Sequence, residues 1–238
     1  DRGVVVGNPD LKPEVARTGD VGFRLALPAL GRVVTGAGLE AAFFDNQIDD
    51  LIVLRLTTAS VSKPENVSAA HVRGQEVVAR ARLWGRLGAS VNYTHQDAQN
   101  VGDDPKARGQ LPGLPADEAY ARLDLDWSPA HPLPLGAWAA PLWPGRLFFD
   151  VDLIAGNVLN QAASQPDVPE NANRRVGSRA YFGVGLELAL PLPGVRLALE
   201  VKNAGDDHTR DVFGFPLPGR TLFATVSWGF RREAGSGR

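Results

Sequence analysis

The four histidines are the residues of this chain best suited to bind a metal or transfer a proton, and their spacing supports neither role. They are scattered as His71, His95, His131 and His208. Zinc and catalytic sites use characteristic short spacings, and no zinc motif, phosphate loop or nucleophile elbow is present. The acidic run "DNQIDD" (45–50) lacks the spacing and the glycine of a calcium loop. We therefore expect no enzyme, no metal site and no cofactor.

Composition narrows the class of protein further. The 238 residues include 0 Cys, which excludes disulfides and thiolate chemistry. A net charge of -2 provides no basic field for nucleic acid, so we expect no nucleic-acid partner. No apolar run approaches the roughly 18 residues that a spanning helix needs. If the protein enters a membrane, it does so with strands.

Alternation of apolar and polar residues is the main signal for structure. Between Val21 and Leu27 the apolar residues fall at every second position, which is the period of a β-strand. The same pattern occurs at 87–94, 121–127, 147–153, 182–190 and 222–230, and more weakly at 33–55, 67–83 and 195–202. This predicts an all-β, antiparallel protein of about nine strands.

The lengths of the connections favour a membrane barrel over a soluble β-sandwich. Short links at 28–32, 84–86 and 191–194 alternate with long ones at 56–66, 97–116, 157–177 and 203–218. Short turns at one end and long loops at the other are typical of outer-membrane barrels. The link 128–146 departs from this rule, since it is long but belongs to the short end.

Aromatic and charged residues fit the same interpretation. The five tryptophans fall at the short-turn end, and Tyr93, Tyr120 and Tyr181 fall near the other, as two interfacial girdles would. Parity predicts that a set of charged residues faces a water-filled lumen, mostly as plain hydrophilic lining. This set is Glu76, Arg80, Arg82, Arg122, Asp124, Asp126, Asp150, Asp152, Glu187, Glu200 and Lys202.

Three blocks of sequence resemble the barrel of TonB-dependent outer-membrane receptors. The first is "NPDLKPEVARTGDVGF" (8–23), with Asn8, Pro9, Leu11, Lys12, Pro13 and Glu14 as its motif. The second is "FFDNQIDDLI" (43–52) followed by "ENVSAAHVRGQEVVARARL" (65–83). The third is "VKNAGDDHTRDVFGFPLPGRTLFATVSWGF" (201–230), with Asn203, Pro218, Gly219, Arg220 and Phe230.

The resemblance implies the C-terminal portion of a larger, plugged barrel over residues 1–230. Receptors of this kind have roughly 22 strands, so about nine cannot close the circle. The earlier strands, the plug and the segment that contacts TonB would then lie upstream of Asp1. The implied role is the barrel wall of a receptor in the outer membrane of a Gram-negative bacterium, in contact with membrane lipid. The family imports scarce solutes such as ferric siderophores or cobalamin.

The motif residues are expected to act structurally. Pro9 and Pro13 suit a turn that leads into a strand, and Gly219 allows the chain to re-enter the wall after a loop. Phe230 resembles the terminal aromatic that the barrel assembly machinery recognises. Residues 231–238 carry no alternation and are expected to form a polar tail.

Solute contacts are expected in the long loops, which supply charge and hydrogen-bond donors at the mouth. The candidates are Gln96, Asp97, Arg174, Arg175, His208 and Arg210. An adjacent Arg pair could bind a carboxylate or phosphate group. Two other classes of protein stay open at this point, a passive porin and a soluble β-sandwich that binds carbohydrate or protein.

The parity of the strands leads to a direct test. Leu186→Arg would place a charge on the lipid-facing side, at a cost of roughly 2–4 kcal/mol near the middle of the membrane. We expect it to impair membrane assembly far more than Gly185→Arg or Glu187→Arg, which alter the lumen side. The amount of folded protein in the membrane fraction measures this, and equal damage at both parities would contradict the assignment.

Overall fold

One large antiparallel sheet forms most of the structure. The computed structural model describes residues 4–58, 61–66, 69–102, 109–111, 113–128, 143–158, 175–212 and 215–229. The sheet runs in the order β17-β14-β13-β10-β9-β7-β6-β3-β2, with the short β8 beside β7. Within these ranges no helix is long and apolar enough to span a membrane.

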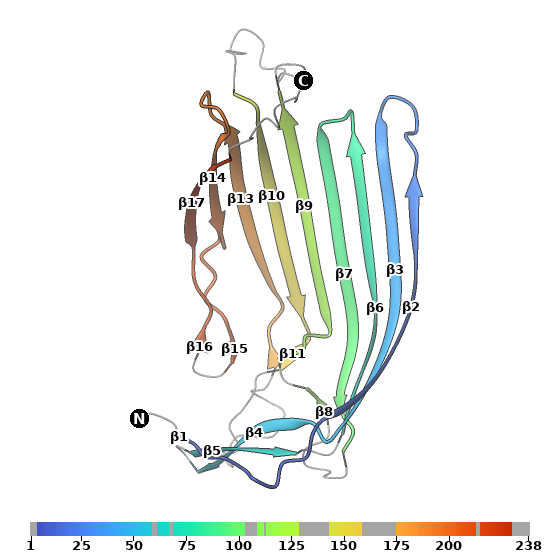
Figure 1. Ribbon diagram of the computed structural model, residues 1–238, viewed down its shortest axis with the longest axis vertical. Helices are drawn as coiled ribbons and strands as arrows, with labels where there is room; N and C mark the ends of the chain where they lie inside the picture. Colours follow the sequence, from blue (N-terminus) through green and yellow to red (C-terminus); the bar gives the residue numbers. More distant parts are fainter. Residues whose placement is uncertain are drawn as a thin grey trace, which may run out of the picture.

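The strands of this sheet lie side by side in a curved wall (Figure 1). Their bounds are β2 (Val15–Leu27), β3 (Val34–Asp49), β6 (Ala69–Leu83), β7 (Leu87–Asn100), β8 (Gly109–Gln110), β9 (Asp117–Trp127), β10 (Gly145–Ala155), β13 (Arg179–Ala189), β14 (Val195–Lys202) and β17 (Thr221–Trp228). The nine long strands confirm the predicted number. The turns that follow β2, β6 and β13 gather at one end of the wall, as predicted (Figure 1).

Residues 33–55 do not form one strand, and this prediction was wrong. β3 ends at Asp49, and Asp50 adopts a positive φ of 56°, which ends the ladder. β4 (Ile52–Thr58) then joins β5 (Val61–Asn66) and β1 (Val4–Val5) in a separate sheet that lies crosswise at the long-loop end (Figure 1). The predicted link 56–66 is therefore largely strand. A long connection gains from such pairing, because its backbone groups find hydrogen-bond partners.

Two further strand pairs extend the loops at the same end of the wall. β11 (Asn157–Val158) pairs with β12 (Arg175–Val176), and β15 (Arg210–Val212) pairs with β16 (Phe215–Pro216). Both pairs lie in segments predicted as long loops.

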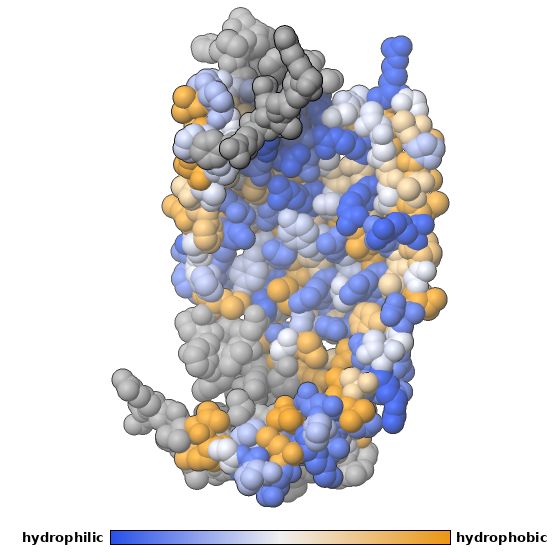
Figure 2. All heavy atoms as spheres, in the orientation of Figure 1, coloured by the Kyte–Doolittle hydropathy of each residue, from blue (hydrophilic) through white to orange (hydrophobic). Residues whose placement is uncertain are grey.

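The register places apolar residues on one face of the sheet in continuous rows. One row crosses all nine strands through Leu27, Ala37, Ala81, Ala89, Leu123, Phe149, Val184, Val201 and Leu222. The adjacent row on the opposite face reads Ala26, Gly38, Arg80, Ser90, Arg122, Asp150 and Gly183. Figure 2 shows hydrophilic residues across the middle of the visible face and hydrophobic residues along its two sides. We call the side of the sheet that carries the first row the apolar face, and the side that carries the second row the charged face.

Polarity inverts where β3, β6 and β7 approach the long-loop end. On the side that is charged elsewhere, Ala70, Val72 and Ala98 are buried, with at most 9% of their surface exposed. β8 pairs with β7 beside this end of the strand, and the Leu111 amide donates to the Ala98 carbonyl at 2.8 Å. The opposite side of the same strands carries polar residues, namely Asp45, Gln47, His71, Arg73, Asp97 and Gln99.

The aromatic residues follow the prediction only in part. Trp84 lies in the turn after β6, and Trp127 is buried at the end of β9 with its Nε1 donating to the Trp143 carbonyl at 2.7 Å. Tyr120 and Tyr181 both pair with Asp152 and so lie on the charged face. These two tyrosines cannot belong to a lipid-facing girdle, which corrects the prediction. Trp138 lies outside the described residues.

Gly185 is also less tolerant than parity alone indicates. The Phe148 ring lies directly over it, and a Cβ at this position would collide with ring atoms. Phe148 is only 6% exposed. Gly185→Arg would therefore disturb packing as well as add charge, and Glu187→Arg is the cleaner control for Leu186→Arg.

The inversion of polarity can be tested on one strand. Val72 and Val78 lie on the same side of β6, but Val72 is buried at the long-loop end while Val78 lies nearer the middle of the strand, paired with Glu40 of β3. Val72→Arg should lower the free energy of unfolding by about 3 kcal/mol or more, as an unpaired buried charge does. Val78→Arg should cost little, since the charged face accepts it. Thermal unfolding of the intact protein measures both, and similar losses would show that the inversion is misassigned.

Candidate functional site: the charged face

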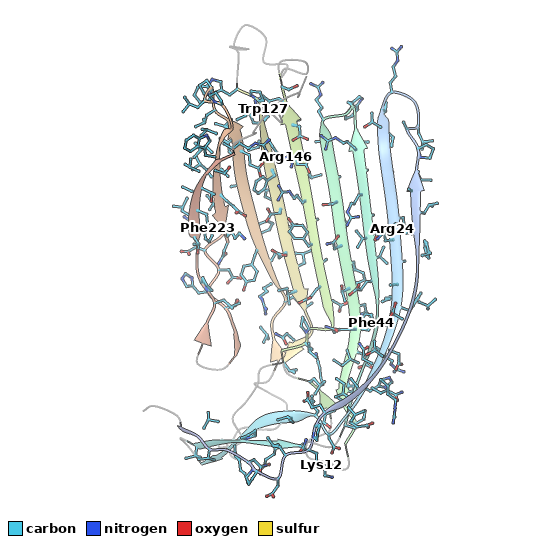
Figure 3. All side chains as sticks on the ribbon, viewed as in Figure 1. Lys12, Arg24, Phe44, Trp127, Arg146 and Phe223 are labelled. Carbon is cyan, nitrogen blue, oxygen red and sulfur yellow. The ribbon has the colours of Figure 1, made fainter. Side chains whose placement is uncertain are left out.

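The predicted lumen charges all lie on one face, as the register shows, and their partners divide them into groups. The group nearest the short turns centres on Asp126 of β9. Its Oδ1 accepts a hydrogen bond from Arg146 Nε at 2.6 Å, and its Oδ2 accepts one from Arg82. Arg146 lies near the short-turn end of the wall (Figure 3). The group ties β6, β9 and β10 together.

Gly88 allows Arg82 to reach Asp126 across an intervening strand. Gly88 lies on β7 between Arg82 of β6 and Asp124 of β9. A Cβ at Gly88 would collide with the Asp124 carboxylate. Without a side chain there, Arg82 Nη1 also comes within 3.8 Å of Asp124 Oδ2. The three side chains Arg82, Asp126 and Arg146 are 42, 24 and 39% exposed, so water screens this group only in part.

A second group lies on the neighbouring strands nearer the edge. Glu40 of β3 accepts hydrogen bonds from Arg24 at 3.0 Å and from Arg80 at 2.9 Å. The two arginine side chains are 76 and 61% exposed. Exposed pairs of this kind contribute little to stability. Arg24 and Arg80 therefore keep much of their surface available to a further partner.

On β10 and β13 the side chains lie flat along the wall. Phe148 covers Gly185, and the Arg122 guanidinium lies 3.7 Å from the centre of the Phe148 ring. Asp150 lies over Gly183 in the same way. The glycines supply the space for this arrangement.

The first sequence motif joins the entry to β2 with the small sheet. Asn66 is the centre of the contact: its Oδ1 accepts the Lys12 amide at 2.8 Å, and its Nδ2 donates to the Lys12 carbonyl at 3.0 Å. Asn8 Nδ2 donates to the Pro64 carbonyl at 2.9 Å, and Glu14 Oε1 accepts the Ile52 amide at 2.6 Å. These contacts give Asn8, Lys12 and Glu14 a structural role.

Residues of the third sequence block close the loop between β14 and β17. Asn203 adopts a positive φ of 50° and is 8% exposed, and its Nδ2 donates to the carbonyls of Asp207 at 2.8 Å and Pro218 at 3.2 Å. The Arg220 amide donates to Asp206 Oδ1 at 2.7 Å. This hydrogen bond, with the nearby His208 and Arg220 charges, holds the pKa of Asp206 below its usual range. Asn tolerates a positive φ better than most residues do, which fits it to this turn.

The predicted solute contacts are not brought together in the described structure. Gln96 Nε2 donates to the Pro115 carbonyl at 3.0 Å, whereas Asp97 points to the opposite face and binds Gln99 at 2.6 Å and Arg73 at 3.3 Å. His208 is exposed in its loop, with Nε2 4.0 Å from Asp206 Oδ1.

The other predicted residues can be placed only in part. The backbones of Arg175 and Arg210 lie in β12 and β15, but their side chains are outside the described structure. Arg174, Phe230 and the segment 231–238 are outside it altogether.

Sequence reasoning missed the glycines that shape this face. Gly88, Gly183 and Gly185 each lie beneath a neighbouring carboxylate or ring. Each occupies a position where parity predicts a lumen-facing side chain, so the sequence alone could have shown that these positions lack one. What the sequence could not supply was the register, which decides which side chain lies over each glycine.

Comparison with known proteins gives the family and the fold. The family described as "TonB dependent receptor-like, beta-barrel" matches residues 1–204. No curated protein matches the chain in sequence. Among solved structures, the FrpB iron transporter from Neisseria meningitidis (F3-3 variant) aligns with a TM-score of 0.61 at 16% identity, over 94% of this chain and 32% of its own.

Two further structures align over a similar extent. The copper transporter OprC gives a TM-score of 0.65 at 18% identity, over 93% of this chain and 31% of its own. A mutant of the ferric enterobactin receptor PfeA from Pseudomonas aeruginosa, in complex with enterobactin, gives a TM-score of 0.57 at 19% identity, over 93% of this chain and 32% of its own. At these identities the likeness establishes the fold, and the chain spans about a third of each structure.

The Asp126 group predicts a measurable coupling between strands. Asp126→Asn should lower the free energy of unfolding by about 1–3 kcal/mol, because Arg82 and Arg146 both lose a charged acceptor. Glu200→Gln is the control. Glu200 has a single, long ion pair of 3.7 Å with the exposed Lys202, so this substitution should cost less than about 1 kcal/mol. Denaturant unfolding of the intact protein compares them, and equal losses would remove the special role of Asp126.

Proposed function

We propose, since this chain belongs to the family of TonB-dependent receptor β-barrels, that it forms part of the wall of an outer-membrane receptor that imports a scarce metal or metal chelate. Proteins of this family are transporters and not enzymes. The remaining wall, the plug and the contact with TonB would be supplied by further chain, since the solved relatives are about three times as long.

The observation that carries this proposal is the row of apolar residues across all nine long strands, with charged residues on the opposite face. From Ala119 to Trp127 the apolar face of β9 extends about 26 Å along the strand at roughly 3.3 Å per residue. A tilt of about 40° reduces this to ~20 Å across the membrane, close to the apolar band of outer-membrane barrels. In the described structure no second sheet covers this face, because large apolar residues on it such as Val21, Phe149 and Val226 are 69, 45 and 69% exposed. A soluble sandwich would need one.

The two edges of the sheet support the larger barrel. β2 and β17 end the strand order, and in the described structure each pairs on one side only. Unpaired backbone groups are too costly to expose to lipid, so strands in a membrane form closed barrels. We propose that further strands close the wall between β2 and β17, and that residues 1–230 belong to one barrel domain with 231–238 as a tail.

The nature of the solute is inferred from the relatives and from the loops. Structures that align with this chain are described as iron and copper transporters and as siderophore receptors. A ferric siderophore is the first candidate, with a copper complex or cobalamin next. Arg174, Arg175, His208 and Arg210 remain proposed contacts at the long-loop end. Gln96 and Asp97 are weaker candidates, because both already bind other residues of the wall.

The exposed charges of the wall suit the plug as a partner. Arg24 and Arg80 share one carboxylate, Glu40, and keep more than half of their side-chain surface exposed. They could pair with carboxylates of a plug inside the barrel. We also propose the outer membrane of a Gram-negative bacterium as the location, and the barrel assembly machinery as a partner that recognises the last strand through Phe230.

Energy dependence of uptake tests the proposal against a passive porin. Cells that carry the intact receptor should accumulate radiolabelled iron from a ferric siderophore, and a protonophore should abolish this accumulation because the coupling to TonB needs an energised inner membrane. Uptake of a small sugar through general porins serves as the control for membrane integrity. Iron uptake that persists with the protonophore would identify an open pore and contradict the receptor.

A further inference from the structure

The segment between β14 and β15 is attached to β13 at both of its ends. At its start, the Ala204 amide donates to the Phe182 carbonyl at 2.7 Å. At its end, the side chain of Thr209 is hydrogen-bonded through Oγ1 to Tyr181 Oη. Phe182 and Tyr181 are consecutive residues of β13, so the segment 204–209 forms a bend that leaves the wall and returns to it at almost the same point.

The two attachments differ in kind. The attachment at Ala204 is made by the backbone, directly after Asn203, whose buried side chain is hydrogen-bonded within the same turn. The attachment at Thr209 depends on one pair of hydroxyl groups. The Thr209 carbonyl also accepts the Leu217 amide at 2.8 Å, but this bond joins the segment to the returning chain. Within the described residues, the Tyr181 hydroxyl is the hydrogen-bond partner that joins the far end of the segment to the wall.

The position of Tyr181 is fixed by the wall and not by the segment. Tyr181 lies on the charged face, paired with Asp152 of β10. The Arg179 guanidinium lies 5.8 Å from the centre of the Tyr181 ring, and Arg179 is only 7% exposed. A cation over an aromatic ring is attracted to it, so this contact restricts the ring. The Tyr181 hydroxyl therefore offers Thr209 a partner whose place is set by the sheet.

Thr209 stands between two of the predicted solute contacts. His208 precedes it and has 67% of its side chain exposed, and Arg210 follows it as the first residue of β15. Because each residue has only two free backbone torsions, fixing Thr209 also restricts both of its neighbours. A ligand binds more tightly to residues whose binding conformation is already populated.

We propose that Tyr181 is a positioning residue. Its hydrogen bond to Thr209 holds the segment 204–209 against the charged face, and this keeps His208 and Arg210 in place to bind the solute. Tyr181 acts through the segment and not by contact with the solute. The inference rests on the proposed function, because it takes the charged face to be the inner side of a receptor.

Hydrogen exchange of the intact receptor without solute tests the hydrogen bond. Tyr181→Phe keeps the ring and removes the hydroxyl, and Thr209→Val removes the other partner. Each should raise amide exchange at 205–210 about five- to tenfold, the effect of one hydrogen bond, and the double variant should add nothing further. Thr209→Ser keeps a hydroxyl and should keep the protection. Tyr120→Phe is the matched control, because Tyr120 pairs with the same Asp152 and its hydroxyl has no hydrogen bond within the described residues.

Iron uptake by cells that carry the intact receptor separates positioning from a general loss of structure. The probes are radiolabelled iron bound to enterobactin, which is present in one aligned structure, to citrate and to a hydroxamate siderophore. For the probe that is imported, Tyr181→Phe should raise KM about five- to tenfold and leave the maximal rate and the melting temperature unchanged. Tyr120→Phe should change none of the three quantities.

The outcomes distinguish the inference from the proposed function. Unchanged exchange in Tyr181→Phe, an equal rise in Tyr120→Phe, or additive effects in the double variant would overturn the hydrogen bond as the attachment. Faster exchange in Tyr181→Phe with an unchanged KM would overturn its role in binding. A native receptor that imports none of the three probes would instead contradict the proposed function, and the exchange measurement would still decide whether Tyr181 holds the segment.

Discussion

Backbone pairing in antiparallel register is the constraint on which the rest of this structure depends. Residues that pair across a ladder share a face, and successive residues along a strand alternate between faces. A shift of one residue between β9 and β10 would place Asp150 and Asp152 among the apolar rows that now hold Phe149 and Val151. One register therefore builds the apolar rows, the charged face and the fit of each side chain over its glycine at the same time.

The same constraint explains why polarity inverts along β3, β6 and β7. Pairing fixes which residues share a face, but the surroundings decide which face must be apolar. Under the proposed function the apolar face meets lipid within the band, and Val77, Val91 and Ala119 lie on that face. Toward the long-loop end the same side carries Asp45, His71 and Asp97, while Ala70 and Ala98 are buried on the opposite side. Under the proposed function, the position of this switch in polarity marks the level at which the wall leaves the membrane.

Alternation in the sequence was sufficient to predict the nine strands and their faces, because a period of two needs no knowledge of tertiary contacts. It could not predict that Asp50 ends β3 or that 52–66 forms a second sheet, since a positive φ and a distant partner such as Asn66 leave no periodic trace. Tyr120 and Tyr181 were placed by their distance along the strand, although their parity already put them on the charged face. The resemblance identified motif residues, but the contacts that explain them appear only in the folded chain.

The pairing of charges on the wall bears on where a receptor of this kind would discriminate among solutes. Asp126 is shared by two arginines, and Arg122 is stacked on Phe148, so these groups are already engaged with neighbours on the sheet. Binding a solute there would first require these contacts to be broken, at a cost in free energy. The loop residues start without such a cost where their side chains are exposed, as His208 is. Under the proposed function the wall is therefore best suited to give shape and hydration to the passage, and selection of the solute falls to the loops and to the plug.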